Sequence, residues 1–429
     1  MAERMNERPA VSELAHENLM EEICADDIVA RALKQVQQNA GAPGVDGMTV
    51  HDLGRHVRRH WPEIRDQLLS GTYSPQPVLR REIPKPGGGM RQLGIPTVLD
   101  RMIQQMVKQV LEQHWDRTFS EHSYGFRPGR SAHQAVARAQ HYIEQGYHWV
   151  VDIDLEKFFD RVNHDRLMAR LAQGVKDKRV LRLIGAFLRA GVLEDDLVSP
   201  LTEGTPQGGP LSPLLSNIVL DELDRELEFR GHRFVRYADD CNIYVGSERA
   251  GQRVMASVSR FITQKLKLRV NQRKSAVDRP SQRKFLGFSF TNETRPRRRI
   301  APESLKRLHL RVRKLTRRAR GVSLATVVME LASYLKGWRQ YYGYCETPWV
   351  LTRQEGWIRR RLRSFVWTQW KTRQRREKRL RSLGLPAEDA ARAARSRWGP
   401  WANSSDKPLQ QALPNRYFSE LGLPALVSQ

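Results

Sequence analysis

The sequence contains few cysteines, fewer acidic than basic residues, and no long apolar run. Cys24, Cys241 and Cys345 lie far apart and form no CxxC pair, which excludes a disulfide framework and the common zinc modules. No apolar stretch approaches the roughly 18 residues of a membrane span, and the first residues lack the apolar region of a signal peptide. No internal repeat is visible either. We therefore expect a cytoplasmic protein that does not enter a membrane.

Basic charge is unevenly distributed along the chain. The formal net charge of +26 points to a polyanionic partner such as nucleic acid. Residues 1–280 contain 40 Lys and Arg against 37 Asp and Glu, a net charge of +3, so +23 lies after residue 280. Most of this excess falls in residues 281–320 and 359–381. We expect the C-terminal third to bind the polyanion, and high salt to weaken that binding; a solvated helix face is the alternative for each run.

Two adjacent carboxylates stand at a predicted β-hairpin turn. Aromatic and β-branched residues flank Tyr237-Ala238-Asp239-Asp240 on both sides, which is typical of two strands. Neighbouring acidic side chains are unfavourable unless a divalent cation lies between them, and Mg²⁺ takes oxygen ligands and substrate phosphates. An exposed Asp-Asp turn is the ordinary interpretation of an isolated pair. The metal hypothesis therefore depends on a second acidic element.

That second element is a predicted strand over residues 149–160. Asp152 and Asp154 occupy alternate positions along it, so their side chains share one face. Two-metal phosphoryl transfer needs carboxylates from separate elements to hold two ions about 4 Å apart. The carboxylates of Asp154, Asp239 and Asp240 could supply this site. Asp152 is a rival for the position of Asp154.

Eight short blocks follow one another along the chain. They are Gly44-Val45-Asp46-Gly47, residues 83–91 with Leu93-Gly94-Ile95-Pro96, residues 124–131 (YGFRPGRS), the Asp154 strand, residues 204–213 (GTPQGGPLSP), the Tyr-Ala-Asp-Asp turn, Asn271-Gln272-Arg273-Lys274, and Phe285-Leu286-Gly287-Phe288. Any one block is weakly specific. Together, and in this order, they resemble a reverse transcriptase of the bacterial group II intron type, a maturase.

The resemblance implies an α+β fold with the right-hand architecture of a polymerase. The implied parts are an N-terminal extension and the start of the fingers (1–75), fingers and a palm with an antiparallel sheet (76–295), an all-helical thumb or maturase X domain (296–381), and a basic, aromatic nucleic-acid-binding tail (382–429). Periodicity agrees with this division, because apolar residues recur at helical spacing over 305–315, 324–342 and 355–381. The chain would therefore change from mixed to helical structure near residue 300.

The resemblance also implies catalytic roles. Asp154, Asp239 and Asp240 match the metal triad of the family, which holds two Mg²⁺ ions that Mn²⁺ can replace. The carbonyl of Leu155 is a further expected ligand. Lys274 matches a lysine proposed as the general acid for pyrophosphate, although a surface lysine would look the same. The residues implied to bind the incoming deoxynucleotide are Lys85, Arg91, Phe159, Gln207 and Leu155.

Each of these substrate contacts has a plainer alternative. Phe159 resembles the steric gate that excludes a ribose 2′-hydroxyl, but a buried core phenylalanine is the alternative, and we expect Phe158 to be the core member of the pair. The glycines after Lys85 let a ligand approach the backbone closely, and a plain hairpin turn explains them almost as well. The amide of Gln207 could order the nucleotide sugar.

Basic residues outside the predicted metal site are expected to contact nucleic acid. Arg127 and Arg130 fit phosphate contacts, whereas Gly125 and Pro128 would shape their loop. Aromatic residues in the helical region could stack on bases, but at helical spacing they more often form core. The other candidates are Lys306, Arg307, Arg311, Arg313, Lys314, Arg359, Arg360, Arg361 and Lys371. Expected partners are group II intron RNA, an RNA template with a DNA primer, target DNA and dNTPs; the oligomeric state is left open.

Three functions are compatible with these features. The first is an RNA-directed DNA polymerase that binds group II intron RNA, assists its splicing and copies it into DNA during retrohoming. A domesticated reverse transcriptase in repair or phage defence would keep the same site without a surrounding intron. A splicing-only, RNA-binding maturase would be expected to lose metal carboxylates, and all three are present. Nothing resembles the cysteine-rich endonuclease domain of many relatives, so we expect an endonuclease-less protein, as in the group II-C class, in the bacterial cytoplasm.

Overall fold

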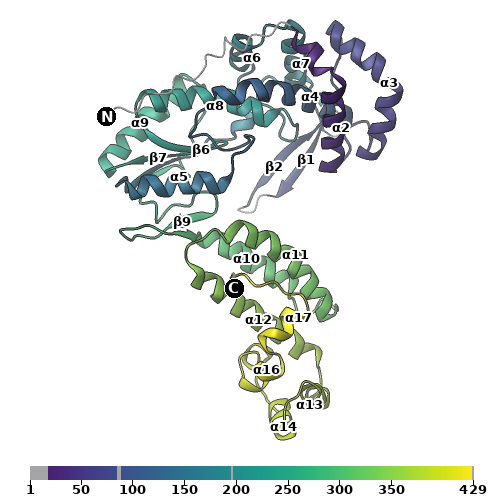
Figure 1. Cartoon of the computed structure of the whole chain (residues 1–429), viewed down its shortest axis with the longest axis vertical. Coiled ribbons are helices and arrows are strands. Elements are labelled where there is room, and N and C mark those ends of the chain that lie inside the picture. Colours follow the sequence, from purple (N-terminus) through teal and green to yellow (C-terminus); the bar gives the residue numbers. More distant parts are fainter. Residues whose placement is uncertain (1–17, 85–87, 195–196, 428–429) are drawn as a thin grey trace. The chain divides into compact units, whose positions relative to one another are not determined.

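The chain forms two compact units (Figure 1). The computed structural model describes residues 18–84, 88–194 and 197–427. The first unit ends at Arg279 and the second begins at Pro280. This boundary precedes the one predicted at residue 295, because β9 (Phe288–Phe290) pairs with β10 (Arg298–Ile300) within the second unit. The predicted α+β class is confirmed, with mixed sheets in the first unit and mostly helices in the second.

The first sheet lies beside the N-terminal helices of the first unit. Its strand order is β2-β1-β4-β5. The strands are β1 (Val78–Pro84), β2 (Met90–Ile95), β4 (Val192–Glu194) and β5 (Leu197–Ser199), and the helices are α1 (Leu19–Ile23), α2 (Asp26–Asn39), α3 (Val50–Ser70) and α4 (Val98–Trp115). β1 and β2 form an antiparallel pair, in agreement with the hairpin turn that the glycines after Lys85 suggested. Part of its turn, including Lys85, lies outside the described residues, so the predicted role of Lys85 stays a prediction.

The second sheet carries the predicted metal carboxylates. Its strand order is β6-β7-β3-β8, and neighbouring strands are antiparallel. The strands are β3 (Trp149–Ile153), β6 (Arg233–Tyr237), β7 (Asp240–Val245) and β8 (Ala276–Asp278). The strand predicted over 149–160 is shorter than expected, because the chain turns at Lys157, with φ of +49°, into the 3-10 helix η3 (Phe158–Asp160).

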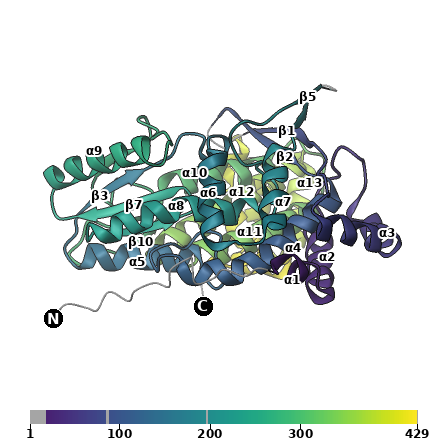
Figure 2. The same ribbon diagram turned by 90° about the horizontal axis from the view of Figure 1, so that it is seen from above.

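Helices cover both faces of the second sheet (Figure 2). The remaining helices of the first unit are η2 (Asp116–Thr118), α5 (Ala132–Glu144), α6 (His164–Gly174), α7 (Lys178–Arg189), α8 (Ser212–Phe229) and α9 (Glu248–Gln264). On one face Gly251 of α9 lies so close that an added Cβ would be 2.4 Å from Val277 and 3.5 Å from Val245. On the opposite face Tyr244 contacts Tyr142 of α5, with ring centroids 5.7 Å apart. A ligand can therefore reach this sheet more easily at its end than across its faces.

The second unit has one hydrophobic core that runs from β10 to the C-terminal helices. Its helices are α10 (Pro302–Leu315), α11 (Leu324–Tyr342), α12 (Pro348–Gln369), α13 (Arg373–Ser382), α14 (Ala387–Ala394), α15 (Pro400–Asn403), α16 (Lys407–Ala412) and α17 (Asn415–Glu420). The single helix predicted over 355–381 was wrong, because Pro348 begins α12, as suits a first-turn proline, and Thr372 caps a separate α13. Within the described ranges, none of the helices has the length and apolar character required to cross a bilayer.

Candidate active site

The β6–β7 hairpin places Asp239 and Asp240 at the end of the second sheet. Tyr237 pairs with Asp240, so Ala238 and Asp239 form the two-residue turn that the sequence predicted. Ala238 has φ of +57°, a left-handed value that costs a residue with a Cβ roughly 1–2 kcal/mol. The turn must therefore be held by contacts from the surrounding structure.

A buried ion pair supplies those contacts. Arg236 and Asp224 of α8 are both fully buried, and the guanidinium donates to the two carboxylate oxygens at 2.7 and 2.5 Å. Its third nitrogen donates to the carbonyl of Ala238 and to Oδ1 of Asn217, each at 2.9 Å. Asn217 in turn donates to the carbonyl of Gly125 at 2.9 Å. The strained turn is thus tied to α8 and to the loop around Gly125, and nothing in the local sequence pattern indicated this network.

The loop of the YGFRPGRS block closes against the same turn. Gly125 lies so close that an added Cβ would be 2.2 Å from the amide nitrogen of Ala238. The amide of Tyr124 donates to the carbonyl of Arg236 at 2.9 Å. This block therefore supports the turn that carries the two carboxylates, which agrees with the shaping role expected for Gly125.

Arg127 does not have the position expected of a phosphate contact. Its side chain is only 5% exposed. Its guanidinium donates to the carboxylate and carbonyl of Asp116 and to the carbonyls of Ser120 and Ser123. With these donors used inside the protein, Arg127 holds the loop in this structure, and its predicted phosphate contact stays a prediction. Arg130 remains half-exposed, with its guanidinium 5.5 Å from the ring centre of Tyr124.

Asp154 lies one residue beyond β3, where the register with β7 leads to Asp240. The carbonyl of Asp154 accepts from the amide of Asn271 at 2.8 Å, and its amide donates to the hydroxyl of Ser275 at 3.0 Å. These bonds bring Lys274 to the site, with its Nζ 3.3 Å from Oδ2 of Asp154. Sequence reasoning missed Ser275, because a single serine outside any motif gives no signal.

Charged residues from three other segments act on the carboxyl of Asp239. Burial raises the pKa of its carboxyl above the usual range, and the neighbouring carboxylate of Asp154 raises it further. Arg91 and Lys274 act in the opposite direction. Asp152, the rival of Asp154, pairs with Asn242 two residues further along β7 from Asp240. The structure therefore brings Asp154, and not Asp152, to the turn.

Two of these carboxylates suit a divalent cation. Among the described residues, no group of three or more His, Cys, Asp or Glu side chains is placed to hold a metal ion by itself. Mg²⁺, however, is commonly held by one or two carboxylates together with water and substrate phosphates. Asp154 and Asp239 offer hard oxygen ligands whose mutual repulsion a cation would relieve. Leu155 is buried and forms an isolated antiparallel β-bridge with Val270. The role of its carbonyl as a metal ligand stays a prediction.

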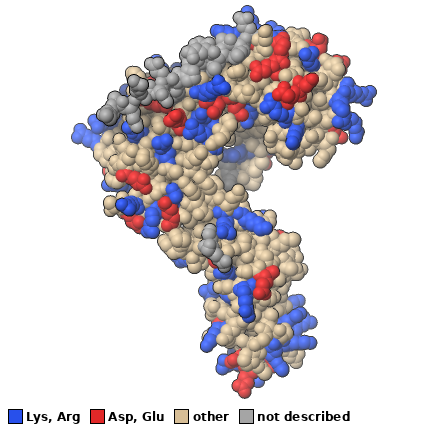
Figure 3. Space-filling view, in the orientation of Figure 1, with Lys and Arg blue, Asp and Glu red and all other residues tan. Residues whose placement is uncertain are grey.

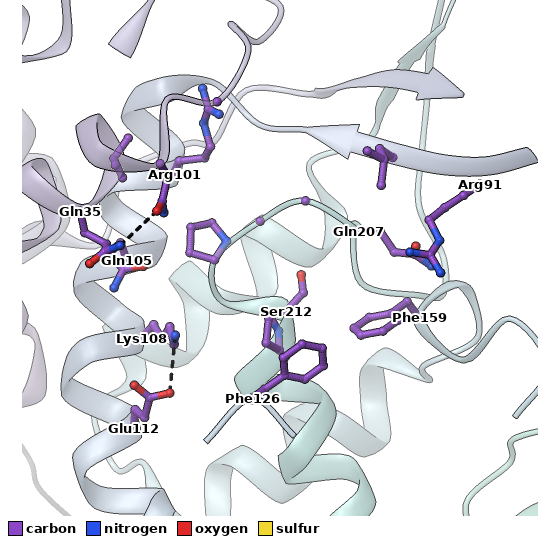
Figure 4. Close-up of a pocket in the computed structure, with 18 residues that line it drawn as sticks. Gln35, Arg91, Arg101, Gln105, Lys108, Glu112, Phe126, Phe159, Gln207 and Ser212 are labelled. Atoms are coloured by element: carbon purple, nitrogen blue, oxygen red, sulfur yellow. Dashed lines mark hydrogen bonds and ion pairs between the residues drawn. The ribbon is translucent and has the colours of Figure 1, made fainter. Parts of the chain in front are cut away.

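A pocket of about 760 Å³ is lined by three of the predicted substrate residues (Figure 4). Arg91, Phe159 and Gln207 lie together on one side of it. The amide of Thr205 donates to the carbonyl of Phe159 at 2.6 Å, and the amide of Gly94 donates to the carbonyl of Gln207 at 2.9 Å. The GTPQGGPLSP block thus joins β2 to η3 and sets the three side chains beside one another.

Phe158 and Phe159 differ in exposure as expected. Phe158 is 3% exposed and belongs to the hydrophobic core, whereas Phe159 is half-buried and lines the pocket. Their rings meet edge to face, with centroids 5.2 Å apart. The core residue thereby fixes the ring that faces the pocket.

The basic residues predicted in the second unit fall into two groups. Arg359 pairs with Glu355 at 3.1 Å, and Arg361 donates to the hydroxyl of Thr316 at 3.0 Å while burial lowers its pKa. These two cations therefore have partners inside the unit, and their nucleic-acid contacts stay a prediction. Arg360 is also held within the unit, on Trp401. The exposed group comprises Lys306, Arg307, Arg311, Arg313, Lys314 and Lys371.

Comparison with known proteins gives two family matches. Residues 83–290 match the profile described as reverse transcriptase (RNA-dependent DNA polymerase), and residues 305–384 match the group II intron, maturase-specific domain. Protein YkfC of Escherichia coli (strain K12) is 37% identical over 220 residues, covering 50% of this chain and 58% of that protein. Group II intron-encoded protein LtrA of Lactococcus lactis subsp. cremoris is 32% identical over 330 residues, covering 62% and 55% respectively. The chain thus spans little more than half of the length of these relatives.

Proposed function

Because the chain belongs to the family of group II intron reverse transcriptases and maturases, we propose that it polymerises DNA on an RNA template. We further propose that it binds group II intron RNA, assists its splicing and copies it into DNA during retrohoming. The observation that carries the polymerase proposal is the convergence of Asp154, Asp239, Arg91 and Lys274 at the end of the second sheet. Two carboxylates and two cations suit a site for a triphosphate and its metal ions.

Asp154, Asp239 and Asp240 would hold two Mg²⁺ ions, which Mn²⁺ could replace. Such ions activate the attacking 3′-hydroxyl and neutralise charge on the leaving pyrophosphate. The proposed role of Lys274 is to carry a proton on Nζ toward the pyrophosphate, and its position beside Asp154 keeps the ammonium at the carboxylates. The cost of burying Asp239 next to Asp154 would be offset once a cation is bound.

The pocket would take the incoming deoxynucleotide. Arg91 would bind the triphosphate, Phe159 would exclude a ribose 2′-hydroxyl, and the amide of Gln207 would orient the sugar. The opposite wall of the pocket is polar and is built by α2 and α4 (Figure 4). Its residues include Gln35, Asn39, Arg101, Gln105 and Lys108. Glu112 lies on the same wall and pairs with Lys108 at 3.6 Å, so the amides and Arg101 are the groups suited to the template base and its phosphate.

The second unit would provide most of the affinity for RNA. α10 exposes Lys306, Arg307, Arg311, Arg313 and Lys314 along one helix. Each phosphate that such residues neutralise releases counterions, so affinity should fall steeply as salt rises. The match of residues 305–384 to the maturase-specific domain supports intron RNA as the partner.

Primer extension on an RNA template with Mg²⁺ tests the polymerase proposal. We expect the Asp239→Ala/Asp240→Ala variant to lose extension and to keep its affinity for RNA, because the two functions are assigned to different units. Asp152→Asn is the matched control, and it should extend while Asp154→Asn should not. Tight RNA binding without any extension by the wild-type protein would instead support a splicing-only maturase.

Flanking DNA distinguishes a mobile intron protein from a domesticated enzyme. Group II intron sequence around the gene would support retrohoming, and its absence would favour a role in repair or phage defence. Splicing assistance is tested separately, by adding the protein to the surrounding intron RNA at low Mg²⁺ and measuring ligated exons.

A further inference from the structure

Two tryptophans in the C-terminal part of the second unit are exposed to solvent. Trp398 exposes 66% of its surface and Trp401 exposes 39%. They lie after the residues that match the maturase-specific domain. Exposed tryptophan is unfavourable in water and is typical of binding surfaces, where the ring supplies a large contact area.

Buried polar side chains fix the backbone that carries these rings. Asn403 is 2% exposed, and its Nδ2 donates to the carbonyls of Trp398 and Gly399 at 2.7 and 3.2 Å. The hydroxyl of Ser404, which is fully buried, donates to the carbonyl of Trp401 at 2.6 Å. The rings are thus presented by an ordered turn, so that little conformational entropy is lost when a ligand binds.

Arg360 of α12 places a cation against this turn. Its guanidinium carbon lies 4.1 Å from the ring centre of Trp401. The guanidinium also donates to the carbonyl of Trp401 at 3.2 Å and to the hydroxyl of Ser404 at 3.3 Å. A planar cation held on an indole ring is a favourable surface for an electron-rich aromatic ligand with a negative charge nearby.

The charges around the tryptophans are mainly positive. Arg395 and Arg397 are exposed just before Trp398. The side chain of Asp406 caps α16 by accepting from the amide of Lys407. On the face that Figure 3 shows, the second unit carries more Lys and Arg side chains than acidic ones. This setting favours a polyanion over an acidic or apolar protein surface.

We propose that Trp398, Trp401 and Arg360 form a stacking platform for unpaired bases of single-stranded RNA. Aromatic faces stack on any base, and neighbouring arginines bind the backbone, so the platform would bind RNA without strong sequence preference. It would bind a duplex more weakly, because only the two terminal base pairs of a blunt duplex expose a face. The inference rests on the proposed function only in taking RNA as the partner, as the adjoining maturase-specific domain suggests.

Fluorescence anisotropy with the full-length protein tests this platform. The probes are a labelled 12-nucleotide oligouridylate and a blunt RNA duplex of equal length. Loss of one stacked base costs on the order of 5- to 100-fold in affinity, so Trp398→Ala/Trp401→Ala should weaken oligouridylate binding by at least about 10-fold and duplex binding far less. The slope of affinity against salt should stay the same, because no phosphate contact is removed.

Trp349→Ala is the matched control. Trp349 is also in the second unit and is 62% exposed, but it lies at the start of α12, away from the turn in sequence. This variant should bind both probes like the wild-type protein. Trp398→Tyr/Trp401→Tyr should restore most of the affinity, and Arg360→Lys should lose part of it despite its unchanged charge.

Several outcomes would overturn the platform. They are an unchanged affinity of the double alanine variant, an equal loss in Trp349→Ala, and an equal loss on the duplex. Primer extension by the wild-type protein is measured alongside. Its absence would refute the polymerase proposal, while the anisotropy result would still decide for or against the platform.

Discussion

Replacing Arg236 by methionine should destabilise the first unit and also abolish the proposed polymerase activity. Methionine fills a similar volume but donates no hydrogen bond, so Asp224 would remain fully buried without its ion-pair partner. Breaking a buried pair from one side typically costs about 3–5 kcal/mol. The carbonyl of Ala238 would also lose the hydrogen bond that Arg236 donates to it at 2.9 Å. Such a bond contributes about 1 kcal/mol, which is similar to the cost of the left-handed backbone conformation of Ala238.

The loss of the hydrogen bond to the carbonyl of Ala238 should lower the rate of primer extension. A displacement of about 1 Å at a catalytic group can lower the rate on the order of 100-fold, and Asp239 follows Ala238 directly in the turn. The double variant Arg236→Met/Asp224→Leu separates the two effects. It should recover most of the stability, because no unpaired charge stays buried, yet it should remain slow because Ala238 still lacks its donor.

Urea unfolding of the first unit and steady-state primer extension measure the two effects. Arg230→Met is the control, because Arg230 pairs with Glu226 at the partly exposed end of α8, where a pair contributes roughly 0–1 kcal/mol. Full activity in Arg236→Met would refute the reasoning. So would a double variant that regains its rate together with its stability, since the turn would then not depend on Arg236.

Three further changes test other parts of the site. Phe159→Val should raise ribonucleotide use relative to deoxynucleotide use by on the order of 10- to 100-fold in kcat/KM, and an unchanged ratio would contradict the steric gate. Gly125→Ala should cost about 1–3 kcal/mol of unfolding free energy and slow extension, because the added Cβ would lie 2.2 Å from the amide nitrogen of Ala238. Burial alone would raise the pKa of Asp177, but hydrogen bonds, above all from Arg179, leave it below its usual value of 3.8. The charged carboxylate therefore stabilises the fold above about pH 4, and this contribution is lost as the pH falls further. Asp177→Asn should lower the unfolding free energy by about 1–3 kcal/mol at pH 7 and by much less near pH 3.

The hairpin that carries the proposed active-site carboxylates could be predicted from the sequence because its signals are local. A hairpin with Asp239 and Asp240 at its turn follows from alternation and turn chemistry within about a dozen residues. The same holds for the β1–β2 hairpin and for helices with a regular apolar stripe, such as α10 and α11. Family resemblance then joined these local blocks into one active site.

Boundaries and breaks were less predictable. The division at Arg279/Pro280 depends on contacts that β9 makes within the second unit. β9 pairs with β10 and packs against α11, where the ring centroids of Phe288 and Tyr341 are 5.6 Å apart. The break between α12 and α13 depends on Thr372 as a cap, within a run of basic residues whose composition suits one continuous helix. In both places a tertiary or capping contact overrides the periodicity.

The sequence by itself determined the class of chemistry, the mixed fold of the first unit and the position of the basic charge. Only the tertiary structure decided which residues support the site. It joined Arg236 to Asp224 and Asn217, placed Ser275 against Asp154, and turned Arg127 inward. Periodicity reports which side of an element is apolar, whereas the partner of a buried polar group lies on another segment of the chain. That choice depends on packing between distant segments, because a buried donor or charge is stable only where the fold supplies its acceptor.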